Sequence, residues 1–381
     1  MRIAIVGPVF PYRGGISYCT SRLASELGRR HEVRISSFSR QFPKRFYPGG
    51  DDVDPTLASR TPSNARFSLD VLNPFSWIME ALAIRRWRPD AVILVWWIWV
   101  WAIPYLVIRK LLPRSTRVVL QAHNVGEKES ARWKVKLSRA MLSVADALIV
   151  HARSEENEAR ARLGDTAPPI HRLFLPVHEM GGAAVDRPEA RQRLGFSADE
   201  TLVLCFGHVR PYKGVDLALK AWNRVRRPAR LIVAGEFWWD QEALCRRIIE
   251  DEKIEDRVHI EGRFIPDDEI ALWFSAADLI LAPYRSEAQS GVVMTAFHFG
   301  RAVAASTVGG MPEVVEDGVN GFLIPPESPE AIAEGVNRAL MADREALERG
   351  ARESAGKYSW ERYGCAVETA LGAGSEVDSD R

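Results

Sequence analysis

Two cations stand close together where the chain is expected to turn from a strand into a helix. In FGHVRPYKGVD (206–216), Arg210 and Lys213 flank a proline turn, and Gly214 precedes an expected helix. Two cationic side chains in such a loop can neutralise a diphosphate. The stretch contains neither GxxxxGKS/T nor GxGxxG, so it is neither a P-loop nor a dinucleotide-binding fingerprint.

An acidic side chain lies beside a row of small residues in PYRSEAQSGVV (283–293). Glu287 follows the end of an expected strand, and the residues from Ser290 onward look like the start of a helix that reaches Gly300. An acid here can bind sugar hydroxyls while the free amides of the helix start hold a phosphate. The alternative is a structural loop with a capping Glu. The density of small residues, including Gly309–Gly310, favours the binding site.

The N-terminal half has two weaker signals of the same kind. Gly14–Gly15 open a helix that ends near Gly28, and paired glycines let backbone amides approach an anion. His123, in QAHN (121–124), stands at the carboxyl end of a strand, where ligand sites of open α/β sheets lie. It can donate hydrogen bonds to a sugar hydroxyl or phosphate, or relay a proton. A plain glycine turn and a His that fixes its loop remain the alternatives.

The residues around these stretches alternate between short β-branched runs and helical patterns, which predicts βα units and parallel sheets. The strand runs are almost continuously apolar, as in strands buried on both faces. They form two sets, separated by a linker near 176–190 and a helix that ends at Gly195, so two α/β domains are expected. The clearest strand candidates are RIAIV (2–6), EVRIS (32–36), AVILVWW (91–97), RVVLQAH (117–123), ALIVHA (147–152), TLVLCFG (201–207), RLIVAGE (230–236), VHIEG (258–262), DLILAPY (278–284) and AVAAS (302–306).

AVILVWWIWVWAIPYLVI (91–108) has no charged residue and is borderline in length for a membrane span. Its first residues look like a strand, Pro104 suits the first turn of a new helix, and another strand pattern follows. A span here would remove one βα unit from the sheet, so a strand, a Trp-rich crossing and a helix are favoured. We expect Trp99 and Trp101 on the cleft side of this domain, where indoles can stack on a sugar or cover a lipid tail.

Length and composition fit a protein of two domains with real cores. The chain has 381 residues, of which 46% are hydrophobic and 27% charged. Its four cysteines are scattered and form no ligand spacing, so neither a disulfide framework nor a zinc site is expected, and a reducing compartment fits. The N-terminal MRIAIVGPVF looks like a first strand rather than a signal peptide. A cytoplasmic protein is therefore expected.

The charge is divided unevenly along the chain. Residues 1–178 carry 27 Lys+Arg and 15 Asp+Glu, whereas the remainder carries 24 and 35. A basic half can attract phosphates or an anionic membrane surface, although drift in surface composition explains the numbers equally well. By its spacing, KESARWKVKLSRAMLSV (128–144) forms an amphipathic helix with Trp133 on the apolar face and Arg132 and Lys136 on the basic face. Such a helix can lie on anionic lipid, and packing on its own sheet is the somewhat favoured alternative.

RPYKG, the block beginning EAQSGVV, and GGMPEVVEDGVNGFLIPP, in this order and spacing, resemble retaining glycosyltransferases of family GT4. The resemblance extends over nearly the whole chain and is most specific in residues 206–326. It implies the GT-B fold, in which two Rossmann-like α/β domains with parallel sheets face each other across a cleft. Residues 1–178 would then bind the acceptor and 179–357 the sugar nucleotide. A helix at 358–371 would cross back to the first domain, ahead of a disordered tail at 372–381.

The resemblance also assigns roles to single residues. Arg210 and Lys213 match the pair that binds the donor diphosphate and stabilises its departure, and His123 matches the cleft histidine near the reacting carbon. Glu287 matches the first Glu of the family's E-x7-E motif, which contacts the donor sugar. Phe264 and Ile265 lie where the family packs the nucleobase. The full set of expected donor-binding positions outside the four catalytic residues is Gly15, Gly207, Phe264, Ile265, Ser290, Gly291, Val292 and Thr295.

One motif position departs from the pattern of the family. The second Glu of E-x7-E, which usually binds the ribose hydroxyls, is Thr295, a side chain that hydrogen-bonds but supplies no charged acceptor. The variant QSGVV is associated with a subgroup of these transferases. The letters of a metal-binding DxD motif occur at Asp52–Asp54 and Asp378–Asp380, but neither ends a buried strand. No metal site is therefore expected, because two cations are available for the diphosphate.

The sequence thus predicts a metal-independent hexosyltransferase that retains anomeric configuration and needs no cofactor beyond its sugar-nucleotide donor. The expected acceptor is a hydroxyl of a glycan, with a lipid-linked glycan as one option, in the synthesis of cell-surface polysaccharide or glycoconjugate. Peripheral contact with an anionic membrane is a further expectation, and nucleic acid is not an expected partner. Two alternatives stay open: a GT-B sugar-nucleotide epimerase, and a non-catalytic partner protein that kept the fold.

Overall fold

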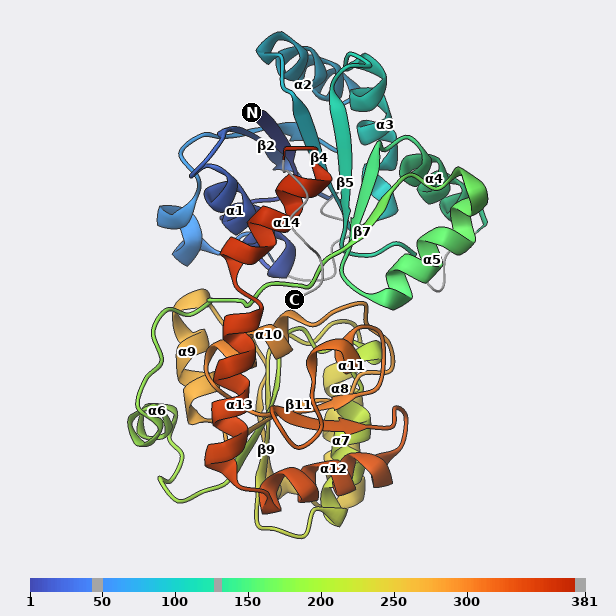
Figure 1. Cartoon of the computed structure of the whole chain (residues 1–381). Helices are drawn as coiled ribbons and strands as arrows, with labels where there is room; N and C mark the ends of the chain where they lie inside the picture. Colours follow the sequence, from blue (N-terminus) through green and yellow to red (C-terminus); the bar gives the residue numbers. More distant parts are fainter. Residues whose placement is uncertain (43–50, 127–131, 374–381) are drawn as a thin grey trace. The chain divides into compact units, whose positions relative to one another are not determined.

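The chain forms two compact units in the computed structural model, which describes residues 1–42, 51–126 and 132–373 (Figure 1). Unit 1 contains Met1–Phe174 together with the C-terminal segment that begins at Trp360, and unit 2 contains Leu175–Ser359. Each unit has its own parallel sheet and its own buried apolar core. The predicted architecture of two α/β units with parallel sheets is therefore confirmed.

Seven parallel strands build the sheet of unit 1, in the order β3-β2-β1-β4-β5-β6-β7. The strand order reverses between β1 and β4, and ligands of open α/β sheets bind beyond the carboxyl ends of strands at such a point. The strands are β1 (Arg2–Val6), β2 (Glu32–Arg40), β3 (Ala65–Asp70), β4 (Ala91–Trp96), β5 (Arg117–Ala122), β6 (Ala147–Val150) and β7 (Ile170–Arg172).

Helices from both ends of the chain cover the sheet of unit 1. Helix α1 starts beside Gly14 and ends at Gly28, as the sequence predicts, and α14 lies along it, with the rings of Tyr18 and Trp360 6.0 Å apart (Figure 1). The helices of the unit are α1 (Gly15–Leu27), α2 (Pro74–Trp87), α3 (Ala102–Leu111), α4 (Arg132–Ser143), α5 (Arg153–Leu163) and α14 (Trp360–Ala370).

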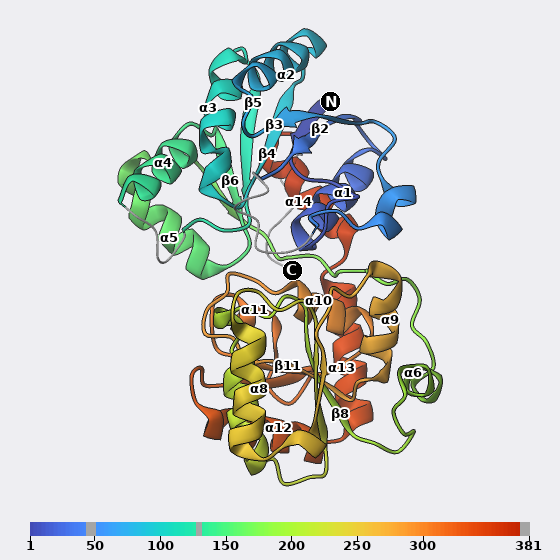
Figure 2. The same cartoon turned by 180° about the vertical axis from the view of Figure 1, so that it is seen from behind.

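Six parallel strands build the sheet of unit 2, in the order β10-β9-β8-β11-β12-β13, which reverses between β8 and β11. Helix α7 contacts both α8 and α12. Helix α8 lies on one side of this sheet, and α9 and α13 lie on the other (Figure 2). The strands are β8 (Leu202–Phe206), β9 (Arg230–Ala234), β10 (Val258–Glu261), β11 (Leu279–Ala282), β12 (Val303–Ser306) and β13 (Gly321–Ile324). The helices are α6 (Arg187–Leu194), α7 (Val215–Ala221), α8 (Gln241–Glu252), α9 (Asp267–Ala276), α10 (Gly291–His298), α11 (Met311–Val314), α12 (Pro329–Met341) and α13 (Arg344–Lys357).

All ten strands predicted from the sequence are present, and three further strands were missed. The missed strands β3, β7 and β13 all lie at the edge of a sheet. Two of them lack the continuous apolar run by which the others were recognised, because β3 is only partly buried and β7 has three residues. Strand β13 (GFLI) is apolar and mostly buried but has only four residues.

The apolar stretch 91–108 divides as the sequence predicts. Strand β4 ends at Trp96, a 3₁₀ turn occupies Trp99–Trp101, and α3 begins at Ala102, slightly before the expected start at Pro104. Within the described parts of the chain, no helix is both long and apolar enough to cross a bilayer. The amphipathic helix predicted over 128–144 is observed as α4, and residues 127–131 lie outside the described residues, as does the predicted tail from 374 onward.

Candidate functional site

The loops that follow β8 and β9 run side by side beyond the carboxyl edge of the unit 2 sheet. The amide of Val209 donates to the carbonyl of Glu236 (2.9 Å), and the amide of Trp238 donates to the carbonyl of Val209 (3.1 Å). The loops can come so close because Gly235 has no side chain: a Cβ there would stand 2.0 Å from the carbonyl oxygen of Gly207. The pairing fixes the start of the RPYKG loop against the β9 loop.

Arg210 lies on an aromatic surface supplied by the β9 loop. Its guanidinium carbon is 3.5 Å from the centre of the Trp238 ring, and Trp238 is almost fully buried. The Trp238 indole N–H donates to the carboxylate of Glu236 (3.2 Å), and His208 Nδ1 is 3.4 Å from the same carboxylate. Burial lowers the pKa of His208; Glu236 opposes that shift, Arg210 and Lys213 reinforce it, and the net direction is downward.

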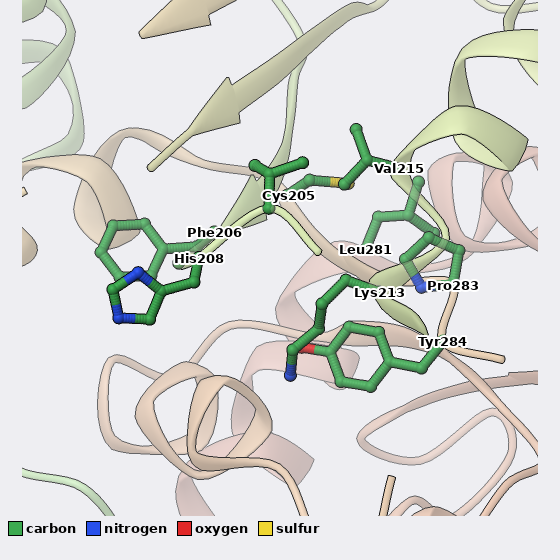
Figure 3. A pocket seen from close by; sticks show the side chains of 10 residues that line it. Cys205, Phe206, His208, Lys213, Val215, Leu281, Pro283 and Tyr284 are labelled. Carbon is green, nitrogen blue, oxygen red and sulfur yellow. The ribbon is translucent and has the colours of Figure 1, made fainter. Parts of the chain in front are cut away.

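Lys213 forms an ion pair with Glu287. Its Nζ donates to Oε2 of Glu287 at 2.8 Å and lies 3.9 Å from the centre of the Tyr284 ring. Burial alone would lower the pKa of the Lys213 ammonium, but Glu287, Tyr284 and Tyr212 together outweigh burial, and the pKa lies above its usual value. Figure 3 shows Lys213 beside Tyr284 in a small pocket whose wall also includes His208. The structure thus joins two residues that are 74 positions apart.

Arg285 holds the loop that carries Lys213. Its guanidinium makes two hydrogen bonds to the carboxylate of Asp216 (2.8 and 2.7 Å), and its backbone amide donates to the carbonyl of Tyr212 (2.8 Å). Gly214 permits the close approach, since it has a φ of +66° and a Cβ there would lie 2.0 Å from the carbonyl oxygen of Pro283. These contacts hold the loops after β8 and β11 against each other.

The segment around Glu287 is packed against the glycine pair of the next loop. Gly310 donates its amide to the carbonyl of Ala288 (2.8 Å), and a Cβ on Gly309 would stand 1.7 Å from the carbonyl oxygen of Glu287. Gly309 also has a φ of +54°, which disfavours any other residue. The predicted second glycine loop is thus a direct support of the acidic residue.

Helix α10 presents its N-terminus at the carboxyl edge of the unit 2 sheet. Ser290 caps it by accepting a hydrogen bond from the amide of Val293, and its hydroxyl is 3.3 Å from that of Tyr284. Gly291 lies against the buried His178, whose pKa burial lowers to about 3. The Thr295 hydroxyl donates to the carbonyl of Gly291 (2.8 Å), so this buried side chain is engaged with its own helix.

The remaining expected donor-binding positions in unit 2 differ in exposure. Gly207 has a φ of +93° at the end of β8, and Val292 is half-buried in the first turn of α10. In the loop after β10, Phe264 is half-buried, whereas Ile265 is only 5% exposed. The Ile265 side chain therefore belongs to the core, and a ligand would meet the backbone at that position.

His123 of unit 1 rests on a chain of aromatic side chains. Its ring centre is 5.1 Å from that of His151, which is 5.9 Å from that of Tyr363 in α14. The Tyr363 hydroxyl accepts a hydrogen bond from Gln121 (2.8 Å). Burial lowers the pKa of His151 to about 4, so its ring is neutral at pH 7. Gly15, the other expected site residue of this unit, is the first residue of α1.

The Trp residues expected on the cleft side of the domain have different environments. Trp101 is fully buried and packs on Phe38 (4.1 Å between ring centres), so its expected exposure is corrected: its indole fills the core because Trp101 is the residue at which the chain turns into α3. Trp99 is half-buried, and its ring meets that of Trp133 edge to face at 4.9 Å. Trp133 is 54% exposed.

The described residues contain no group of three or more His, Cys, Asp and Glu side chains that could hold a metal ion. Of the two DxD sequences, the first has a structural use, because Asp54 caps a short 3₁₀ helix by accepting from the amide of Thr56 (2.9 Å). Asp378–Asp380 lie outside the described residues.

Sequence reasoning missed Trp238, Arg285 and His178 as parts of this site. The β9 loop sequence EFWWD carried a signal, since two adjacent Trp residues follow a strand end in a polar segment. No spacing rule connects Arg285 with Asp216 or His178 with Gly291, because those contacts depend on how separate βα units pack.

Comparisons with known proteins cover both units. The family model for glycosyltransferase family 4 matches residues 13–177, and the model for glycosyl transferases group 1 matches residues 200–342. The D-inositol 3-phosphate glycosyltransferase of Geodermatophilus obscurus is 28% identical over 295 residues, which are 69% of this chain and 59% of that protein. A protein of the same name, numbered 1, from Catenulispora acidiphila is 31% identical over 235 residues, 58% of this chain and 56% of that protein. The chain therefore spans less than six-tenths of the length of these curated relatives.

Solved structures with the same fold match nearly the whole chain. Anabaena Alr3699/HepE in complex with UDP-glucose has a TM-score of 0.74 at 18% identity and covers 98% of this chain and 100% of its own. WaaG, a glycosyltransferase involved in lipopolysaccharide biosynthesis, has a TM-score of 0.67 at 19% identity and covers 99% of this chain and 100% of its own. At these identities the likeness establishes the fold.

Proposed function

The chain belongs to the group 1 glycosyltransferases of family GT4 and has the GT-B fold, and from this premise we propose that it transfers a hexose from a nucleoside-diphosphate sugar to a hydroxyl of a glycan, with retention of anomeric configuration. The observation that carries the proposal is the cluster of Arg210, Lys213 and Glu287 beside the N-terminus of α10. It supplies two cations for a diphosphate, an acid for sugar hydroxyls, and free backbone amides.

The proposed reaction depends on stabilising the leaving group. The bond between the anomeric carbon and the phosphate oxygen breaks, and negative charge develops on the nucleoside diphosphate. Arg210, Lys213 and the α10 amides at Ser290 and Gly291 stabilise that charge, in a site where fixed charges need little reorganisation. The acceptor oxygen forms the new bond on the same face of the sugar and passes its proton to the leaving phosphate. Glu287 orients the sugar by accepting hydrogen bonds from its hydroxyls.

The other donor contacts of the proposal follow the family pattern. Gly15 and Gly207 let backbone approach the phosphates, and Val292, in the first turn of α10, lies beside Gly207. Phe264 and the backbone at Ile265 pack on the nucleobase. Thr295, whose hydroxyl is hydrogen-bonded to the Gly291 carbonyl, supports the helix start beside the ribose rather than binding the ribose itself. His123 lies near the reacting carbon, where a neutral neighbour such as His151 leaves it free of like-charge repulsion.

For the acceptor, we propose a glycan that is lipid-linked at an anionic membrane. Support comes from α4, where Arg132, Trp133 and Lys136 are exposed and Lys134 lies 4.8 Å from the centre of the Trp99 ring. Exposed indoles beside cations are suited to the interface of an anionic bilayer. Co-sedimentation with vesicles containing phosphatidylglycerol should decrease as salt rises and should weaken in Trp133→Glu. Binding that is independent of lipid charge would contradict this part of the proposal.

The donor is tested with a panel of UDP-, GDP-, ADP- and dTDP-sugars, measured by calorimetry and by analysis of products. We expect one nucleotide to bind, and transfer to occur only when an acceptor is present. Conversion of the donor in the absence of any acceptor would indicate an epimerase instead. Failure of every nucleotide sugar to bind would indicate a non-catalytic protein with this fold.

A further inference from the structure

Arg210 and Lys213 differ in how their charges are balanced. Lys213 is paired with Glu287 at 2.8 Å, whereas the side chain of Arg210 has neither an ion pair nor a hydrogen bond among the residues that the structure describes. Its Nε is buried without a partner, and its guanidinium carbon lies 3.5 Å from the centre of the Trp238 ring. An uncompensated cation in a partly buried loop calls for a structural explanation, because surface arginines readily pair with nearby carboxylates.

The carboxylate that could neutralise Arg210 is already engaged. Glu236 stands next to Trp238 in the same loop, but its Oε2 accepts from the Trp238 indole N–H and faces His208 Nδ1. The N–H edge and the face of the indole ring thus have separate uses. The N–H edge holds Glu236, and the π face holds the guanidinium.

We propose that Trp238 is a positioning residue that keeps the Arg210 guanidinium flat, unpaired and available to the diphosphate of the donor. This inference rests on the proposed function of the site. A guanidinium that lies on an indole keeps its N–H edge free, because cation–π attraction uses the face of the group and hydrogen bonding uses its edge. The backbone hydrogen bonds between Val209 and the β9 loop fix the indole relative to Arg210, so little rotamer freedom remains to be lost on binding.

The probe for this proposal is inorganic pyrophosphate, which carries the diphosphate charge without a base or a sugar. Its binding is measured by calorimetry in the wild type and in Trp238→Phe, Trp238→Leu and Arg210→Ala. Phenylalanine keeps an aromatic face, and leucine keeps apolar volume without one. We expect about 3- to 30-fold weaker binding for Trp238→Leu, from the usual strength of a cation–π contact, and a smaller loss for Trp238→Phe.

The double variant Trp238→Leu/Arg210→Ala separates positioning from a general structural role. If Trp238 acts through Arg210, removing it after Arg210 is gone should not weaken pyrophosphate binding further. The matched control is Trp239→Leu: Trp239 is 64% exposed and meets Trp238 edge to face at 5.7 Å, whereas the cation–π partner of Arg210 is Trp238. Pyrophosphate should bind this variant as it binds the wild type. Thermal unfolding of every variant shows whether the unit is still folded.

Three results would overturn the inference. Wild-type affinity in Trp238→Leu would show that the stack does not position Arg210, and so would equal losses for Trp238→Leu and Trp238→Phe. An additive loss in the double variant would assign Trp238 a purely structural role. A wild-type protein that binds neither pyrophosphate nor any nucleoside diphosphate would instead refute the proposed donor site itself, so the two failures are distinguishable.

Discussion

The pairing of Lys213 with Glu287 predicts that substitutions of these two residues have opposite effects on the binding of nucleoside diphosphate and the same effect on glycosyl transfer. Glu287→Gln removes a negative charge next to Lys213 Nζ, and Lys213→Met removes the positive charge. Binding of the nucleoside diphosphate should become tighter in the first variant and weaker in the second. Glycosyl transfer should become slower in both, because the acid and the cation are each needed when the sugar leaves.

The distance between the two groups sets the magnitude. Two unit charges 2.8 Å apart attract by about 1.5 kcal/mol in water and by about 6 kcal/mol at an effective dielectric constant of 20. The side chains are 15% and 22% exposed, so desolvation offsets much of that attraction. A carboxylate roughly 6 Å from a bound phosphate repels it by about 0.7 to 3 kcal/mol. Removing that repulsion should tighten binding by about 3-fold or more.

The cost to transfer is estimated separately for each side chain. Glu287→Gln loses charge-assisted hydrogen bonds to the sugar, which corresponds to roughly 10- to 150-fold slower transfer. Lys213→Met loses stabilisation of the leaving diphosphate, which corresponds to roughly 100- to 1,000-fold. Calorimetry with the nucleoside diphosphate gives the binding change, and release of nucleoside diphosphate under saturating substrates gives the rate.

The matched control is the exposed pair Lys357–Glu316, whose Nζ–Oε1 distance is 2.9 Å. Its side chains are 54% and 50% exposed, and Glu316→Gln should change neither binding nor transfer. Near-normal turnover in Glu287→Gln or Lys213→Met would refute the site assignment. Equal weakening of nucleoside diphosphate binding in both variants would refute the reasoning about shared charge.

Two further predictions concern the support of the site. Gly309→Ala places a Cβ 1.7 Å from the carbonyl oxygen of Glu287, at a residue with a φ of +54°. Because the loop must then shift, glycosyl transfer should fall by at least about 10-fold while the nucleoside diphosphate still binds. Unchanged transfer would show that the loop is not a rigid support. The pKa of His151 is lowered to about 4, so the neutral ring stabilises the fold above pH 6.5 and that stability is lost as the pH falls towards 4. Urea unfolding should show the wild type losing about 1 kcal/mol more than His151→Asn between pH 6.5 and 5.5, and identical pH profiles would contradict the burial of a neutral ring.

The sequence predicted those features that a single βα unit determines. The central strands, the glycine-bounded helix α1 and the capped start of α10 depend on local residue patterns, and all were recognised. The motifs around Arg210, Lys213 and Glu287 were recognised for the same reason, since each motif lies within one loop. The ion pair between Lys213 and Glu287 was not foreseen, although both residues were named, because it depends on β8 and β11 being neighbours in the sheet.

The misjudged residues were those whose environment is tertiary. Trp101 and Trp99 are two positions apart in one apolar run, yet one is enclosed by the core and the other is partly open. Composition does not distinguish them, because the difference arises from the 3₁₀ turn and from Phe38, a residue of a distant strand. The edge strand β3 was missed because a half-exposed strand resembles a polar loop.

The position of α14 in unit 1 has a consequence for the order in which the protein can mature. The sheet of unit 1 is translated in full by Arg172, but the Trp360 and Tyr363 side chains that cover Tyr18 and His151 are synthesised only after the whole of unit 2. During synthesis on the ribosome, the surface of unit 1 that α14 covers therefore stays exposed until unit 2 has been completed. Helix α14 thus completes unit 1 only after unit 2 has been synthesised, and a chain that stops before Trp360 should contain a destabilised unit 1.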